Sequence, residues 1–131
     1  MNLESPKVSI EKSSQIVFDF LTDIKNFKPL MPENISKFEL IDDKTFLFAL
    51  SGMPEIVLKK KSMVSPHTVI LGAAGGKLDF SLTAKIESPS ETQSDVQLTF
   101  EGDFNAMMAM MIKAPISKFI ETLALNIPKK I

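Results

Sequence analysis

The chain has 131 residues, which suits one domain and is too short for two ordinary ones. Its 15 basic residues, all lysine, and 16 acidic residues leave a net charge of −1, which excludes the basic surface that nucleic-acid binding requires. Apolar residues make up 44% and charged residues 24%, the balance of a folded globular protein rather than a disordered one. We therefore expect one domain over residues 1–131 with no nucleic-acid partner.

Several residue types that carry chemistry are absent. The sequence has no Cys, Trp, Tyr or Arg, and its one histidine is His67. Disulfides, thiolate nucleophiles, cysteine-ligated zinc and clusters of imidazoles are thereby excluded. We predict no metal and no cofactor. Asp, Glu, Lys, Ser, Thr and Asn remain, beside an unusual surplus of 10 Phe and 8 Met.

The ends and hydropathy of the chain indicate a cytoplasmic protein. No apolar stretch follows the first charged residues, as a signal peptide would require. No apolar run approaches the roughly 20 residues of a transmembrane segment.

The first predicted elements are a short strand and a helix. Val8 and Ile10 alternate with polar residues, which indicates a strand over 7–12. Ser13 has the side chain of a helix N-cap, and the apolar spacing that follows predicts an amphipathic helix over 14–24. Residues 26–32 contain two prolines and can form only a short helical turn.

Strands dominate the middle of the chain. Alternating apolar residues predict strands over 37–40, 46–50, 55–64 and 67–73, separated by turns. Two cleaner alternations follow over 77–87 and 95–104, on either side of a loop at 88–91, and residues 72–76 (GAAGG) supply a flexible turn before the first. Such a pattern is typical of an antiparallel sheet with one buried and one exposed face. The three lysines at 59–61 point to both faces, which predicts an edge strand or one inward lysine.

The last predicted element is a long helix. Apolar residues from Met108 to Ile127 recur at helical spacing, so residues 105–127 would form a helix about 35 Å long. Pro115 lies inside this segment and predicts a kink near 111–115 or a division into two helices.

The order of these elements, together with three segments, resembles the START-like superfamily, also called the SRPBCC or helix-grip fold. The segments are 8–23 (VSIEKSSQIVFDFLTD), 26–32 (NFKPLMP) and 102–104 (GDF) before the long helix. The similarity covers about residues 5–127 and suggests the polyketide cyclase/dehydrase-like or coenzyme Q-binding-like branch. It implies an α+β fold in which a curved antiparallel sheet of six or seven strands wraps around the C-terminal helix, with two short helices after the first strand.

A single helix cannot fill the hollow of a strongly bent sheet, so we expect a cavity between them. The function that this implies is binding of an apolar or amphipathic, lipid-like or polyketide-like small molecule. Methionines at 107, 108, 110 and 111 cover most of the helix circumference and could fill the core, form an adaptable cavity wall or form a partner surface. The predicted ligand-binding residues are Phe27, Met31, Phe46, Phe48, Met53, Leu71, Phe80, Leu82, Met108, Met111 and Ile112.

Two other functions stay open. One is a cyclase/dehydrase-type enzyme with Asp, Glu or His67 as its base, although the thin polar inventory favours binding over catalysis and predicts no particular catalytic residue. The other is a non-catalytic protein-interaction module that uses the sheet face or the methionine-rich helix. A homodimer is compatible with all three. The sequence does not identify the ligand, nor which side chains of residues 55–74 point inward.

Overall fold

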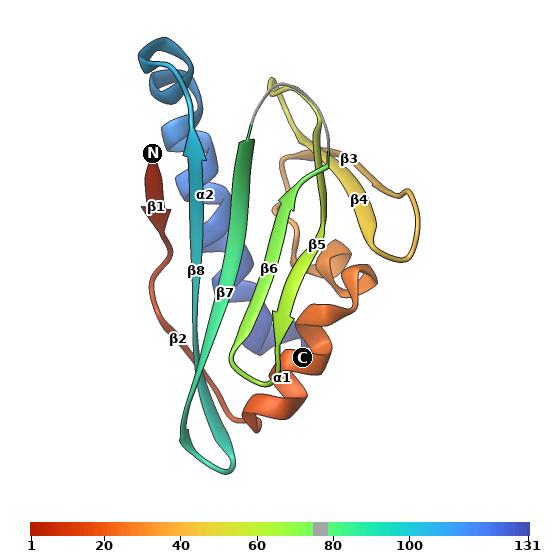
Figure 1. Cartoon of the computed structure of the whole chain (residues 1–131), viewed down its shortest axis with the longest axis vertical. Coiled ribbons are helices and arrows are strands. Elements are labelled where there is room, and N and C mark those ends of the chain that lie inside the picture. Colours follow the sequence, from red (N-terminus) through yellow and green to blue (C-terminus); the bar gives the residue numbers. More distant parts are fainter. Residues whose placement is uncertain (75–78) are drawn as a thin grey trace.

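The computed structural model describes residues 1–74 and 79–131 (Figure 1). Residues 75–76 of the predicted turn over 72–76 and the first two residues of the 77–87 alternation lie outside the described residues. The described chain forms the following elements: β1 (Asn2–Glu4), β2 (Val8–Ile10), α1 (Ser14–Thr22), the 3-10 helix η1 (Ile24–Leu30), β3 (Ile35–Leu40), β4 (Thr45–Leu50), β5 (Ile56–Val64), β6 (Thr68–Ala73), β7 (Asp79–Ser90), β8 (Gln93–Asp103) and α2 (Ala106–Lys130).

All strands join one antiparallel sheet. The strand order is β1-β8-β7-β6-β5-β4-β3, and β2 pairs with β8 beyond the end of β1. The long strands β8 and β7 follow β1 in this order, and α2 lies across one face of the sheet (Figure 1). The predicted α+β helix-grip architecture is confirmed, with eight strands among the described residues rather than six or seven.

Strand β1 is an element that the hydropathy pattern does not predict. It has only three residues, and Leu3 is the only buried one. Its formation depends on pairing with β8 rather than on local propensity, because Leu3 lies opposite Phe100 in that ladder. The amino group of Met1 also donates a hydrogen bond to the carbonyl oxygen of Gly102 over 2.8 Å.

Capping residues define the bounds of the two short helices. The Ser13 hydroxyl accepts a hydrogen bond from the backbone N–H of Ile16, as the sequence predicts for an N-cap. Helix α1 ends at Thr22, two residues earlier than predicted, because Asp23 has an extended backbone and caps η1 in turn. The side-chain amide of Asn126 donates to the carbonyl oxygen of Leu30 over 2.9 Å, which ties η1 to the end of α2.

Helix α2 is continuous through Pro115, so the predicted division into two helices is wrong. The side chain of Asn105 caps it by accepting a hydrogen bond from the N–H of Met108 over 2.8 Å. The helix extends three residues beyond the predicted end at 127. Its buried residues form one stripe that faces the sheet: Ile112, Ile116, Phe119, Ile120, Leu123, Ala124 and Ile127.

The structure also settles the orientation of residues 55–74. Leu58, Val69 and Leu71 are buried on the inner face. Strand β5 lies between β4 and β6, so the prediction of an edge strand at residues 59–61 is wrong. A register shift between Lys60 and Ser62 accommodates the three consecutive lysines at 59–61 inside the sheet, and none of them is buried.

A second difference concerns the predicted loop at residues 88–91. Strand β7 continues to Ser90, through Pro89, and a register shift between Glu87 and Ser90 accommodates the proline.

Candidate functional site

A cleft of about 350 Å³ opens at the edge of the sheet–helix interface, between α2 and two turns. One wall comes from the connection between η1 and β3, another from the turn between β4 and β5, and the third from α2. The cleft is lined by Pro32, Asn34, Leu50, Ser51, Gly52, Met53, Pro115, Lys118 and Phe119. Most of these side chains are apolar, so the cleft combines a hydrophobic wall with a few polar groups, as small-molecule sites do.

The turn between β4 and β5 is held in place by backbone geometry and hydrogen bonds. Gly52 has a φ of 81°, a left-handed conformation that glycine adopts without strain. The N–H and the hydroxyl of Ser51 both donate to the carbonyl oxygen of Asn34, over 2.9 and 3.0 Å. These bonds join two walls of the cleft.

The interior between sheet and α2 is closed. The enclosed cavity there measures about 10 Å³, about the space of one water molecule. Its lining is wholly apolar: Leu21, Phe27, Leu30, Val69, Leu71, Leu82, Ala84, Leu98, Leu123 and Ile127. The expected hollow is therefore filled by side chains in this structure, and the open volume lies at the edge of the interface.

A series of stacked phenylalanine rings connects the cleft to this cavity. Phe119 lines the cleft and stacks on Phe48, with ring centroids 4.6 Å apart. Phe48 lies 6.1 Å from Phe46, which lies 5.4 Å from Phe27 in the cavity wall. Phe38 stacks on the same Phe46 ring at 5.4 Å. These stacked rings run from the cleft lining at Phe119 to the cavity wall at Phe27.

Among residues 1–74 and 79–131, Lys118 is the one charged residue in the cleft lining. Its side chain is exposed, and within the described residues it forms no ion pair. Neither a carboxylate nor an imidazole lines the cleft or the cavity. His67 is exposed in the turn between β5 and β6, where its backbone accepts a hydrogen bond from Ile86 over 2.7 Å.

The predicted ligand-binding residues are distributed over several environments. Phe27, Leu71 and Leu82 line the small cavity, and Met53 lines the cleft. Phe46 and Phe48 belong to the aromatic series between them. The others line neither: Met31 and Met108 pack partly buried against the core, Ile112 is buried in it, and Phe80 stacks on Phe100 at 5.6 Å.

Met111 is 66% exposed and does not contact the interior. The inner stripe of α2 passes through Ile112 and Ile116, and a residue one position away from that stripe is rotated by about 100°.

Most of the cleft lining was not predicted from the sequence. Phe119 lies on the apolar stripe of α2, and Leu50 continues the alternation of β4, so hydropathy could have found both. Asn34 and Lys118 carry no local signal, because only the packing of separate segments brings them together.

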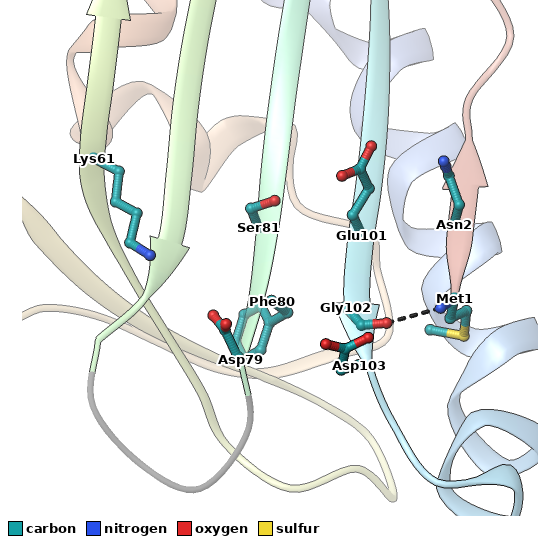
Figure 2. A pocket seen from close by; sticks show the side chains of 9 residues that line it. All are labelled: Met1, Asn2, Lys61, Asp79, Phe80, Ser81, Glu101, Gly102 and Asp103. Carbon is teal, nitrogen blue, oxygen red and sulfur yellow. Dashed lines mark hydrogen bonds between the residues drawn. The ribbon is translucent and has the colours of Figure 1, made fainter.

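A second, more open groove lies on the outer face of the sheet, away from α2 (Figure 2). Its volume is about 500 Å³, and carboxylates dominate its lining: Met1, Asn2, Lys61, Asp79, Phe80, Ser81, Glu101, Gly102 and Asp103. Among the described residues, no group of three His, Asp or Glu side chains is arranged to hold a metal ion. The groove lacks an apolar wall, so we regard the cleft as the candidate site.

No helix in the described part of the chain is long and apolar enough to span a membrane.

Comparisons with known proteins add information at the level of structure. No protein-family model matches the sequence, and no curated protein matches it. Norcoclaurine synthase from Thalictrum flavum superposes with a TM-score of 0.76 at 12% identity, over 98% of this chain and 84% of that one. A protein from Thermus thermophilus gives a TM-score of 0.75 at 10% identity, over 99% of this chain and 96% of that one.

The di-domain ARO/CYC protein BexL gives a TM-score of 0.66 at 9% identity, over 97% of this chain and 46% of that one. Identities this low establish the fold rather than the activity. The sheet order, the helix across it and these superpositions together show that the chain has the helix-grip fold, as the resemblance of its sequence predicts.

Proposed function

We propose that the protein binds an apolar or amphipathic small molecule, which enters at the cleft and directs its apolar part toward the space between sheet and α2. The cleft itself is the observation that carries this proposal. Its volume of about 350 Å³ falls within the range of roughly 300–1,000 Å³ that is usual for ligand sites. Leu50 and Met53 offer apolar contacts on one side and Phe119 on another. Burial of ligand surface against them would contribute roughly 25 cal/mol per Å².

The closed interior is compatible with such binding. An empty cavity of ~300 Å³ would cost on the order of 7 kcal/mol at ~24 cal/mol per Å³, which rivals the stability of a whole domain. A chain without ligand therefore gains from filling that space with its own side chains. Rotation of Phe119 and Phe48 would extend the cleft toward the cavity wall at Phe27, because the stacked rings lead from one space to the other. The predicted residues Phe46, Leu71 and Leu82 would then line the enlarged site.

The similar structures support this use of the fold. Norcoclaurine synthase has also been solved in complex with dopamine and hydroxybenzaldehyde, and that structure superposes on this chain with a TM-score of 0.73. By analogy, small organic molecules are the class of ligand to test first.

Native mass spectrometry tests the proposal directly. Purified protein is sprayed under non-denaturing conditions, and an organic extract of the same sample is analysed for small molecules. We expect a bound mass that is lost on denaturation, and displacement of a fluorescent fatty-acid probe by the extracted compound. A protein that carries no ligand and leaves the probe unbound at all concentrations would contradict the proposal.

The cyclase/dehydrase alternative has weaker support. Acid–base catalysis needs a carboxylate or imidazole near the substrate. Neither lines the cleft or the cavity among the described residues, and Lys118 is the one titratable side chain there.

The interaction-module alternative rests on a separate observation. Three methionines form an exposed methionine surface near the start of α2: Met107, Met110 and Met111 are 75%, 83% and 66% exposed. Adaptable apolar side chains in such numbers are typical of contact surfaces. If this surface binds a second copy of the chain, sedimentation velocity will show a concentration-dependent dimer. The Met107→Ser, Met110→Ser, Met111→Ser triple variant would then remain monomeric. A wild-type chain that is monomeric at every concentration would exclude self-association.

A further inference from the structure

We propose that the cleft selects single-tailed amphiphiles with an anionic head group, which Lys118 holds at the mouth while the tail lies against Phe119. This inference rests on the proposed function and narrows it to a ligand class.

The first argument is the arrangement of two adjacent residues on α2. Lys118 is exposed and Phe119 is 3% exposed, yet both line the same cleft. Consecutive residues of a helix are rotated by about 100°, so one side chain faces the mouth and the next faces the floor. A ligand seated here would meet an ammonium group at one end and an aromatic ring at the other. That is the pattern of an amphiphile whose head carries negative charge.

The second argument is the charge of the surroundings. Within the described residues, no carboxylate lines the cleft, and no acidic side chain forms an ion pair with Lys118. Glu55, which follows the turn between β4 and β5, accepts a hydrogen bond from Lys37 over 2.9 Å. Glu33 is exposed between Pro32 and Asn34, and Glu121 is exposed one helical turn after Lys118, so both are charges that would compete with an anionic ligand. An anion therefore gains a partner at Lys118, whereas a cation gains none in the lining.

The third argument concerns the neutral polar groups. The Ser51 hydroxyl donates its hydrogen bond to the carbonyl oxygen of Asn34 and thereby stabilises the turn. Asn34 lines the cleft, and its side-chain amide group carries N–H donors that a carboxylate could accept from. The cleft thus offers donors to a head group, which suits an acceptor-only group such as a carboxylate.

The experiment compares three probes with similar tails: decanoate, decanol and decyltrimethylammonium. Affinities are measured by isothermal titration calorimetry and by NMR shifts, at concentrations where the amphiphiles are monomeric and circular dichroism shows folded protein. We expect decanoate to bind most tightly and the cationic probe least. Lys118→Met should weaken decanoate binding by up to about fivefold, the value of an exposed ion pair, and leave decanol unchanged.

Two further variants sharpen the test. Lys113→Met removes an exposed lysine of the same helix that does not line the cleft, and it should leave all three affinities unchanged. Glu33→Gln should strengthen decanoate binding, because it removes one of the competing charges. Added salt should weaken decanoate binding to the wild type and have little effect on the Lys118→Met variant.

The outcomes separate the two proposals. Equal binding of decanoate and decanol, with no effect of Lys118→Met, would overturn the anionic preference and leave the proposed function standing. Equal losses in the Lys118→Met and Lys113→Met variants would also overturn it, since general charge would then explain the result. If none of the three probes binds, both the inference and the proposed function are wrong.

Discussion

The ring of Phe48 in β4 stacks on the ring of Phe119 in α2, with centroids 4.6 Å apart and planes within 10° of parallel. Both side chains are at most 3% exposed. This is a direct contact between the sheet and the helix beside the cleft, so Phe119 lines the candidate site while its stack on Phe48 contributes to stability.

Replacement of Phe119 by alanine should lower the free energy of unfolding by about 3 kcal/mol or more, because it removes a buried aromatic side chain and leaves a cavity. Urea denaturation monitored by circular dichroism measures this change. Phe119→Leu keeps most of the apolar volume and serves as the control, with a smaller loss. The alanine variant should also bind decanol more tightly, since the cleft then reaches the ring of Phe48. A loss below about 1 kcal/mol would show that the stack contributes little to the interface.

The N-caps of the two α-helices should differ in their contributions. The Asn105 side-chain oxygen lies 2.8 Å from the N–H of Met108, whereas the Ser13 hydroxyl lies 3.3 Å from the N–H of Ile16. Alanine at either position should cost about 0.5–2 kcal/mol, with the larger loss at Asn105. The change in the urea midpoint, at an unchanged slope, is the measurement. Asn105→Asp retains an acceptor and should recover most of the loss. The reverse order of losses would contradict this prediction.

The strands and α2 could be predicted because their burial is regular. In β8, Val96, Leu98 and Phe100 alternate with polar residues and are all buried. Strand β1 could not be predicted, since its three residues form a strand only by pairing with β8. The position of residues 59–61 inside the sheet was equally hidden, because the bulge that accommodates them depends on the partner strand β6.

The candidate site was predictable only in part. Phe27, Leu71 and Leu82 line the interior as expected from their apolar patterns. Met111 is exposed because the four clustered methionines do not indicate which side of α2 faces the sheet, whereas the stripe from Ile112 to Ile127 does. The volume left between sheet and helix depends on sheet curvature and on rotamers, and neither is encoded in a hydropathy pattern. Lys118 lines the cleft only because tertiary packing brings separate segments together there, so its local sequence could not predict this position.

Asp42 should make stability depend on pH at the acidic end. Its carboxylate accepts a hydrogen bond from the backbone N–H of Lys44 over 2.8 Å, and this bond lowers the pKa of Asp42 below its ordinary value of 3.8. A carboxyl group whose pKa is lower in the folded state stabilises that state above the ordinary pKa, and the contribution is lost as the pH falls through the lower, folded-state value.

The Asp42→Ala variant should therefore be less stable than the wild type at neutral pH, and the difference should shrink as the pH falls below 3.8. Asp43→Ala is the matched control, because the Asp43 side chain forms no hydrogen bond within the described residues. The urea midpoints of the wild type and of both variants, measured across the acidic range, test this prediction. A constant difference between wild type and Asp42→Ala at every pH would assign the loss to another cause.

Gly102 should resist substitution because two aromatic residues occupy the space of a side chain. A Cβ atom there would overlap the ring of Phe104 and would lie 3.0 Å from the Cβ atom of Phe80, which pairs with Gly102 across the β7–β8 ladder. Phe104 in turn stacks 6.2 Å from Phe100, so its ring cannot move away without losing that contact. Gly102→Ala should therefore cost about 1–3 kcal/mol of overpacking, measured by urea denaturation.

The double variant Gly102→Ala, Phe104→Leu distinguishes overpacking from a loss of glycine's backbone freedom. Leucine is smaller than phenylalanine, so the added methyl group gains room, and the double variant should lose less stability than the sum of the two single losses. Simple additivity would mean that the two side chains do not compete for the same space. The φ of Gly102 is not in the left-handed region, unlike that of Gly52, so backbone strain does not provide a second explanation.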